Sequence, residues 1–398
     1  MNSGAANIST ANKSCRDTPP GHLYGDNDTK NNMPAAKYPY IDRVLEQALE
    51  NGSTPGIAAL VNANGEIAYR KAIGHAQIYP EHRALTEETI FDVASLTKVM
   101  ATTTAVMLLL RDKQIALDDS LRKFLPDFPH EQITLTHLLT HSAGFPDHRP
   151  FYELIPAEQS GSPEAKALIL KNIYETDLIY APGTAAKYSD LGFILLGVAL
   201  EKIIGMTLDR FCDEQIFRPF GMAQTFFQPV NSPRRQGDFA ATERCNWRNT
   251  ILCGEVHDEN AYALGGVAGH AGLFSTLDDT HRFMMKLYHC YTGQDETIPK
   301  QIVRQFFTRQ QLVTDSTRAL GWDTPSRNLK EKASGGTIIS ETSVGHTGFT
   351  GVSIWFDLPR KLLMILFANR IHPSRHNQTF LSMRPKIHDT IVIAMERK

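Results

Sequence analysis

A serine and a lysine stand three residues apart at the start of a long apolar run, FDVASLTKVMATTTAVMLLL (residues 91–110). Residues i and i+3 of a helix share one face, so the Ser95 hydroxyl and the Lys98 amine can touch. A serine hydroxyl becomes a nucleophile when a neighbouring base takes its proton, and desolvation suits a lysine to that role by lowering its pKa. The pair therefore indicates covalent catalysis by an activated serine.

The S-x-x-K spacing alone is a weak signal, because about one occurrence is expected by chance in a chain of this length. It recurs as Ser120 and Lys123 in LDDSLRKFLPDF, among charges on what we interpret as solvated surface. The first copy instead follows Phe91 and Val93 and continues into apolar residues, which predicts a semi-buried lysine. We expect chemistry at the first copy and none at the second.

Two other stretches place polar side chains where a cleft could use them. Tyr188-Ser189-Asp190 opens the apolar segment LGFILLG, and His346-Thr347-Gly348 opens a stretch rich in β-branched and aromatic residues. A glycine within a strand lets a ligand backbone approach closely. Both stretches are therefore candidate walls of the site.

In this order, S-x-x-K, Y-x-(N/D) and (K/H)-T-G resemble the motifs of the serine β-lactamase and penicillin-binding-protein superfamily. The tyrosine points to the class C branch, which includes D-amino-acid peptidases and family VIII carboxylesterases. ITLTHLLTHSAGF, IFRPFGM, GHAGLFSTLDD and LGWD are also similar to stretches of that branch, so the resemblance covers residues 37–398. Segment 241–276 resembles the penicillin-binding protein 4B subgroup and domains associated with cell-wall amino-sugar hydrolases, which hints at muropeptide-related substrates.

The resemblance implies a role for each matching position. Ser95 is the nucleophile that forms an acyl-enzyme, and Lys98 shares its proton. Tyr188 relays a proton to the leaving group and then activates water. The backbone N–H groups of Ser95 and Phe349 are the two oxyanion donors, which often supply the largest single catalytic effect.

The substrate-binding positions implied by the resemblance are Asp190, His346, Thr347 and Gly348. Two of them depart from the pattern, because the family usually has asparagine at the first and lysine at the second. An ionised aspartate only accepts hydrogen bonds, and a histidine is mostly neutral near pH 7 and begins to charge near about pH 6. Both changes predict a pocket that disfavours anions.

Asp190 also bears on the mechanism. A carboxylate close to Lys98 would favour the protonated lysine. Lys98 and Tyr188 are then both candidates for the base that takes the serine proton.

The pattern of predicted elements gives an α/β (α+β) fold, which the resemblance makes β-lactamase/transpeptidase-like. Strands near both termini predict one antiparallel sheet flanked by helices, with a helical lobe inserted between them. A hairpin is predicted around Asn64-Gly65, and strands at ALGWDT, SVGHTGFTGVSIWFD and RKLLMILFANR. The expected helices span about 41–49, 95–111, 134–141, 164–175, 188–204, 208–217 and 377–396. The expected divisions are a flexible polar leader (1–36), an α/β lobe (37–94 and 300–398) and a mostly helical lobe (95–299).

Composition narrows the choice of partners. Lys plus Arg number 41 and Asp plus Glu 43, so the formal net charge of -2 supplies no field for nucleic acid. The longest apolar runs are too short to span a bilayer, and the polar start lacks the apolar core of a secretory signal. We therefore expect a cytoplasmic location and no transmembrane segment.

Other possible sites are better explained structurally. The cysteines, with no C-x-x-C pair, are expected to be free thiols: Cys15, Cys212, Cys245, Cys253 and Cys290. His137 and His141 have the i, i+4 spacing of zinc ligands, but the glutamate of the zincin motif is missing. LGGVAGHAG (264–272) matches no phosphate-binding motif and is expected to form a tight turn beside the cleft.

The expected function is that of a serine hydrolase acting through a Ser95 acyl-enzyme, with no metal or organic cofactor. A small neutral ester or amide is the expected substrate. The first alternative is a β-lactamase or a D-amino-acid peptidase, such as a D-Ala-D-Ala carboxypeptidase, acting on cell-wall fragments. The second is a non-catalytic sensor that binds such fragments or β-lactams. The oligomeric state is open.

Overall fold

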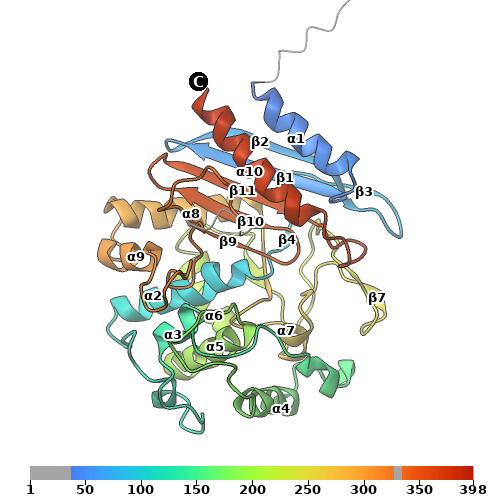
Figure 1. Ribbon diagram of the computed structural model, residues 1–398. Coiled ribbons are helices and arrows are strands. Elements are labelled where there is room, and N and C mark those ends of the chain that lie inside the picture. The colour runs from blue at the N-terminus through green and yellow to red at the C-terminus, as the bar shows by residue number, and fades with distance from the viewer. Residues whose placement is uncertain (1–36, 327–333, 398) are drawn as a thin grey trace, which may run out of the picture. The chain divides into compact units, whose positions relative to one another are not determined.

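The computed structural model describes residues 37–326 and 334–397. The expected leader (1–36) and Cys15 lie outside the described residues. Residues from Tyr38 onward belong to one compact unit, in which a sheet lies between a pair of helices and a larger, mainly helical region (Figure 1).

The main sheet has six strands and joins segments from opposite ends of the sequence. Each strand runs antiparallel to its neighbours, as predicted. The predicted hairpin between β1 (Gly56–Ala63) and β2 (Glu66–Gln77) turns at Asn64 and Gly65, whose φ angles of 56° and 94° suit a two-residue turn. The strand order is β3 (Arg83–Ala84), β2 (Glu66–Gln77), β1 (Gly56–Ala63), β11 (Leu362–Ala368), β10 (Ser353–Asp357) and β9 (Val344–Thr347).

The two central strands are buried on both faces. In β1, Ile57, Ala59 and Val61 pack in the cluster with helices α1 (Pro39–Glu50) and α10 (Phe380–Glu396), while Ala58 and Leu60 belong to the large core on the opposite face. Full burial of such a Val, Leu or Ile side chain contributes about 1.5–3 kcal/mol. The sheet is thus the rigid platform against which the helical region packs.

The helical region carries the middle of the chain. Helix α8 (Leu277–Thr292) packs directly on β1 and β11, so the sheet is covered on this face as well. The other elements are a π-helical segment (Lys98–Thr103) that continues into α2 (Thr104–Arg111), then α3 (Leu135–Leu139), α4 (Pro163–Tyr174), α5 (Asp190–Ile204), α6 (Leu208–Cys212) with a π-helical extension (Asp213–Phe217), α7 (Glu259–Ala263) and α9 (Lys300–Phe307).

Two small sheets complete the fold. One has the order β4 (Phe91–Asp92), β8 (Leu273–Ser275) and β5 (Phe226–Phe227), and the other pairs β6 (Arg244–Cys245) with β7 (Thr250–Ile251). The first matters for function because β4 ends just before Ser95.

Three sequence predictions need correction. ALGWDT is not a regular strand, because the chain reverses at Gly321 (φ 79°) and makes only isolated bridges, one of them from Asp323 to Gly345 of β9. The continuous strand expected after His346 is two strands, β9 and β10, joined by a turn. Ser95 lies in a turn just before the helix rather than in its first turn.

No single helix among residues 37–326 and 334–397 is long and apolar enough to cross a membrane, although the bent pair Asp190–Ile204 and Leu208–Phe217 reaches that length and composition together. Within the same ranges Cys212, Cys245, Cys253 and Cys290 are free thiols, as expected.

Helix α5 and the glycine-rich turn meet without intervening side chains. A Cβ atom built on Gly197 would lie 2.8 Å from the backbone nitrogen of Gly269, whereas one on Gly192 of the same helix would make only an ordinary contact of 3.5 Å with Leu138. The glycine at position 197 therefore allows the turn at 264–272 to pack on the helix.

We predict that Gly197→Ala lowers the free energy of unfolding by about 1–3 kcal/mol, because overpacking outweighs the better helix propensity of alanine. Gly192→Ala is the matched control and should be neutral or stabilising by up to about 1 kcal/mol. Urea denaturation of both variants measures the difference. Equal stabilities would show that the turn yields to the new methyl group without cost.

Candidate active site

Ser95 is held in a tight turn between β4 and the following helix. Ala94, just before it, adopts a left-handed conformation (φ 46°), which is unfavourable for a residue with a Cβ. The Ala94 N–H donates to Asp92 Oδ1 (2.8 Å), and its carbonyl accepts from Thr97 Oγ1 (2.6 Å). Asp92 Oδ2 in turn accepts from the His257 N–H (2.6 Å). Buried hydrogen bonds thus hold the strained turn in place.

Lys98 is completely buried and contacts three oxygen atoms. Its Nζ donates to Ser95 Oγ (3.0 Å) and to the His270 carbonyl (2.9 Å), and it forms an ion pair with Asp190 Oδ1 (2.8 Å). An ammonium group has three protons to donate. The expected contact between Ser95 and Lys98 is confirmed, and the glycine-rich turn supplies the His270 carbonyl beside it.

Lys98 and Tyr188 form an electrostatically linked pair. Burial acts to lower the pKa of Lys98, but Asp190 and Tyr188 outweigh it and the pKa is raised. Burial raises the pKa of Tyr188 to about 12, with Lys98 opposing the rise and Asp190 adding to it. The lysine is therefore an ammonium and the tyrosine a neutral phenol near pH 7. The predicted effect of Asp190 on the lysine is confirmed.

Tyr188 reaches the cleft from the residues just before α5. Its ring lies 4.5 Å from the ring of His141 and 6.1 Å from that of His346, and the Arg318 guanidinium lies 5.4 Å from its centroid. The Ser189 N–H donates to His141 Nδ1 (3.1 Å), which fixes the start of α5. His141 thus positions the tyrosine.

His137 has a structural role as well. It completes a capping box with Thr134 at the start of α3. Within residues 37–326 and 334–397, no cluster of three or more His, Cys, Asp or Glu side chains is arranged to hold a metal ion.

His346 lies on β9 and is buried. Its Nδ1 donates to the Thr347 carbonyl (2.9 Å), so the neutral ring carries its proton on Nδ1. Burial lowers the pKa of His346 to about 4; Lys98 and Arg318 act in the same direction, while Asp323 opposes them. The expectation that His346 begins to charge near pH 6 is therefore wrong. The cause, deep burial beside cations, is not visible in the sequence.

The two residues that carry the predicted oxyanion donors, Ser95 and Phe349, line the same cleft. In the described part of the chain, no backbone hydrogen bond uses the N–H of Ser95 or of Phe349. A Cβ on Gly348 would lie 2.7 Å from the Val93 carbonyl and 2.4 Å from Val352 Cγ2. The glycine in this motif therefore makes room for the protein's own backbone, rather than for a ligand as expected, and it brings the Phe349 amide close to the serine turn.

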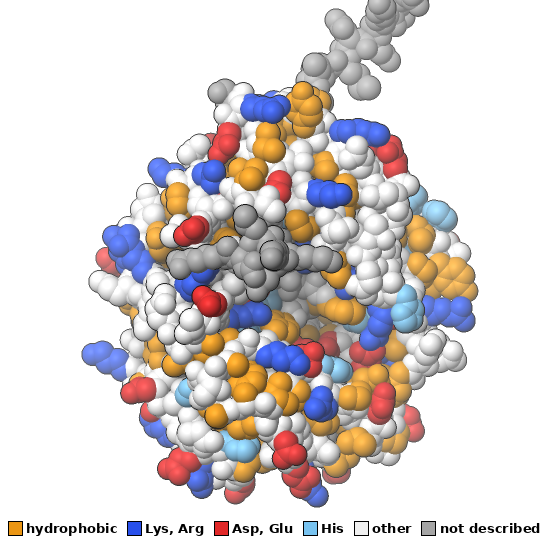
Figure 2. Space-filling view, viewed as in Figure 1, with side chains coloured by type: hydrophobic (Ala, Val, Ile, Leu, Met, Phe, Trp, Pro, Cys, Tyr) orange, Lys and Arg blue, Asp and Glu red, His pale blue; other side chains and the backbone are white. Residues whose placement is uncertain are grey.

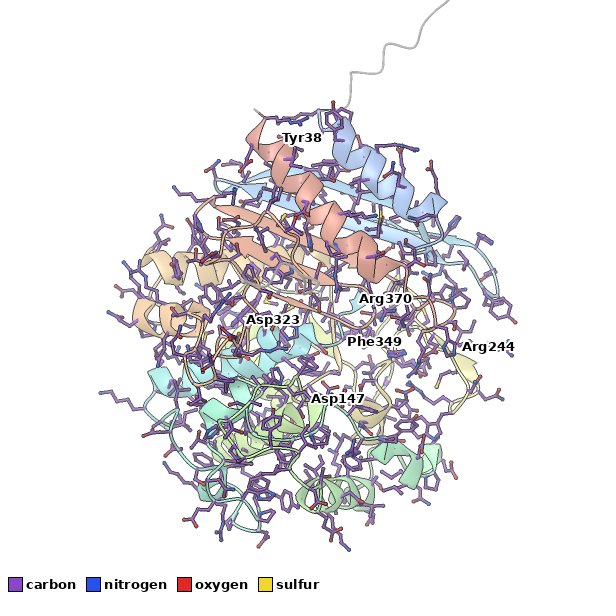
Figure 3. The ribbon with its side chains drawn as sticks, in the orientation of Figure 1. Tyr38, Asp147, Arg244, Asp323, Phe349 and Arg370 are labelled. Atoms are coloured by element: carbon purple, nitrogen blue, oxygen red, sulfur yellow. The ribbon has the colours of Figure 1, made fainter. Side chains whose placement is uncertain are left out.

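A cavity of about 560 Å³ connects these residues. All the predicted site residues line it except Lys98, which lies buried behind Ser95. In Figure 3, Asp323, Phe349 and Arg370 lie near the sheet, and Asp147 lies nearer the helical region. Sequence reasoning missed the charged residues of the lining, which are Asp147, Asp258, Glu259, Arg318, Asp323, Arg370, Arg375 and Arg384.

Two of the missed residues have a visible signal in the sequence. Arg370 ends the apolar run LLMILFANR, and Arg384 interrupts the helix segment FLSMRPKI. A charge among buried residues needs a partner or a function. On the face shown in Figure 2, basic and acidic side chains are interspersed, so the cavity residues are not part of a larger charged surface there.

Comparisons with known proteins agree with this geometry. A relative in Escherichia coli (strain K12), provisionally named a D-alanyl-D-alanine carboxypeptidase, is 32% identical over 361 residues, or 83% of this chain and 82% of the relative. The penicillin-binding protein homologue from Pyrococcus abyssi has a similar structure, with a TM-score of 0.65, 22% identity, and coverage of 86% of this chain and 75% of that one.

The structure of EstCE1, a hydrolase with promiscuous acyltransferase activity, is similar with a TM-score of 0.67 and 19% identity, covering 88% of this chain and 98% of that chain. At these identities the two structures support the fold alone. The family model described as Beta-lactamase matches residues 41–383, nearly the whole described chain. With Ser95 and Tyr188 lining one cavity and Lys98 in contact with Ser95 behind it, the chain belongs to the β-lactamase family of serine hydrolases.

Proposed function

We propose that the protein hydrolyses an ester or amide through an acyl-enzyme on Ser95. The observation that supports this most directly is the contact between Ser95 Oγ and Lys98 Nζ (3.0 Å) inside a cavity with unused backbone donors nearby. The substrate is a D-amino-acid-terminated peptide or a small ester. The Escherichia coli relative supports the former, and the EstCE1 structure agrees with the latter.

Tyr188 is the proton carrier in this proposal. The bond between Ser95 Oγ and the carbonyl carbon forms while the hydroxyl proton passes to the deprotonated tyrosine, and the carbonyl electron pair moves onto its oxygen. Two N–H groups, of Ser95 and Phe349, stabilise that oxygen. Collapse then breaks the bond to the leaving group, which takes the proton from Tyr188. Water repeats the sequence and releases the acid.

Lys98 acts as a fixed cation in this scheme. Its ammonium, held by Asp190, lowers the cost of ionising Tyr188 and remains charged throughout. The reactive state is the one in which the Lys98–Tyr188 pair has lost one proton. The rate should therefore rise with pH above neutrality.

We predict that Ser95→Ala abolishes covalent labelling by a fluorophosphonate, because the nucleophile is gone. Ser120→Ala is the matched S-x-x-K control and should label like the wild type. In that second motif Ser120 Oγ donates to the Glu131 carbonyl (2.6 Å) and Lys123 pairs with Asp119 (2.7 Å), both on exposed surface. Labelling that survives in Ser95→Ala would overturn the acyl-enzyme.

Turnover separates an enzyme from a sensor. The wild-type protein should release p-nitrophenol from p-nitrophenyl butyrate over many cycles. Tyr188→Phe should reduce kcat/KM by roughly 10²–10⁴, the usual contribution of a positioned proton carrier. A single burst equal to the enzyme concentration, without further release, would instead favour the sensor.

We predict that Asp190→Asn shifts the rise of kcat/KM with pH toward lower pH. The carboxylate stabilises the lysine cation and disfavours the tyrosine anion, so its removal makes the first proton easier to lose whichever group releases it. Profiles between pH 6 and 10 measure the shift, and thermal unfolding checks that the variant folds. An unchanged profile, or a shift to higher pH, would contradict this electrostatic role.

A further inference from the structure

Two arginines in the cavity wall are almost completely buried. Arg370 follows β11 and has 2% of its surface exposed, and Arg384 in the second turn of α10 has 7%. Both line the same cavity as Ser95. Burying a charge is costly unless a partner of opposite charge compensates for it.

Neither arginine has such a partner. Considering residues 37–326 and 334–397, no carboxylate lies within 4.0 Å of either guanidinium, and the buried Nε atoms of both make no hydrogen bond. Arg370 donates only from one terminal nitrogen, to the Asn377 carbonyl (2.9 Å). By contrast, Arg375 in the same cavity pairs with Glu243 and Glu259.

The two cations also repel each other. Burial lowers the pKa of each arginine to about 10, and Arg370 further lowers that of Arg384. Asp323, which is itself paired with Arg318, opposes the fall in the pKa of Arg384. Both remain charged near pH 7, so the cavity contains positive charge that an anion would neutralise. Two guanidinium groups suit a carboxylate, which each can bind through paired N–H donors.

The positive charge of Arg370 lies on the side of the cleft that carries the Phe349 amide. The Arg370 guanidinium lies 4.7 Å from the centroid of the Phe349 ring, and the Phe349 amide is the second oxyanion donor of the proposed mechanism. An anion bound there would share the cavity with a carbonyl group placed at Ser95. The neutral His346 does not supply a positive charge to this side.

We propose that Arg370 and Arg384 form a subsite for a carboxylate of the substrate, so that the protein selects acyl donors bearing a free carboxylate, such as peptides with a free C-terminus. The inference rests on the proposed Ser95 mechanism. It reverses the expectation, based on Asp190 and His346 alone, that the pocket disfavours anions.

The test uses two aryl acetates that differ only in the leaving group, 4-acetoxybenzoic acid with its free carboxylate and the methyl ester of that acid. The wild type should hydrolyse the ester that carries a free carboxylate with a higher kcat/KM than its methyl-capped counterpart. Arg370→Gln and Arg384→Gln should each reduce that preference about ten- to a hundredfold, the loss expected for hydrogen bonds between charged groups. Arg244→Gln is the control, because that arginine is exposed and does not line the cavity. If the variants hydrolyse both esters with the same ratio of kcat/KM values as the wild type, the subsite is overturned and the proposed function stands.

If the wild type hydrolyses neither ester, that result counts against the proposed function. A binding measurement then tests the subsite independently of catalysis. Calorimetry with N-acetyl-D-alanine should show binding to wild type and to Ser95→Ala, and at least tenfold weaker binding to Arg384→Gln. Its methyl ester should bind weakly to all. No binding by wild type, or binding of inorganic phosphate alone, would overturn the carboxylate assignment.

Stability gives an independent readout. If Arg384 is an unpaired buried cation, Arg384→Gln should keep or raise the Tm of the ligand-free protein, since the cost of burying the charge disappears. N-acetyl-D-alanine should raise the Tm of the wild type and not that of the variant. A lower Tm in the variant would show that the arginine has a structural partner and would contradict the subsite.

Discussion

The ammonium of Lys98, fully buried yet charged, is the group around which the site is organised. Removing such an ion from water costs several kcal/mol, so every oxygen around it must be fixed by surrounding structure. Three separate segments supply those oxygens: the turn that carries Ser95, the start of α5 with Asp190, and the glycine-rich turn with the His270 carbonyl. The close packing of Gly197 on Gly269 brings the last two together.

In the proposed mechanism, the ion pair between Lys98 and Asp190 divides charge stabilisation and proton transfer between two residues, Lys98 and Tyr188. With Asp190 beside it, Lys98 stays charged, and in the proposed mechanism the tyrosine is the group that moves protons. Asparagine at position 190 would remove the carboxylate that helps to hold the proton on Lys98. The departure from the usual motif thus concerns the proton path more directly than the charge of the substrate.

The family and fold class could be predicted because they depend on short-range signals. The Asn64-Gly65 turn, the apolar β-rich run before it and the three motifs are each readable within a few residues. The sequence also predicted which residues form the site, because the motifs that contain Ser95, Lys98, Tyr188 and Asp190 occur in the order typical of the family. The reversal at Gly321 was missed, because a run of apolar residues looks the same whether it pairs over its length or only at one bridge.

The sequence could not show which charged or titratable side chains are buried, or which of them have a partner of opposite charge. The low pKa of His346 follows mainly from its burial, and then from the positive charges of Lys98 and Arg318, which come from distant segments. Arg370 and Arg384 could be noticed as charges in apolar runs. That neither has a carboxylate partner among the described residues, while Arg375 has two, depends on tertiary structure alone.

The contact of Gly348 with Val93 has a consequence for biosynthesis. These residues are about 250 positions apart, and β1 cannot be completed until β11 pairs with it. A nascent chain that ends before β9 already has its serine, lysine and tyrosine but lacks the second oxyanion amide. Closing so long a loop is slow relative to local helix formation. Under the proposed mechanism, a polypeptide that ends before β9 is therefore expected to be inactive.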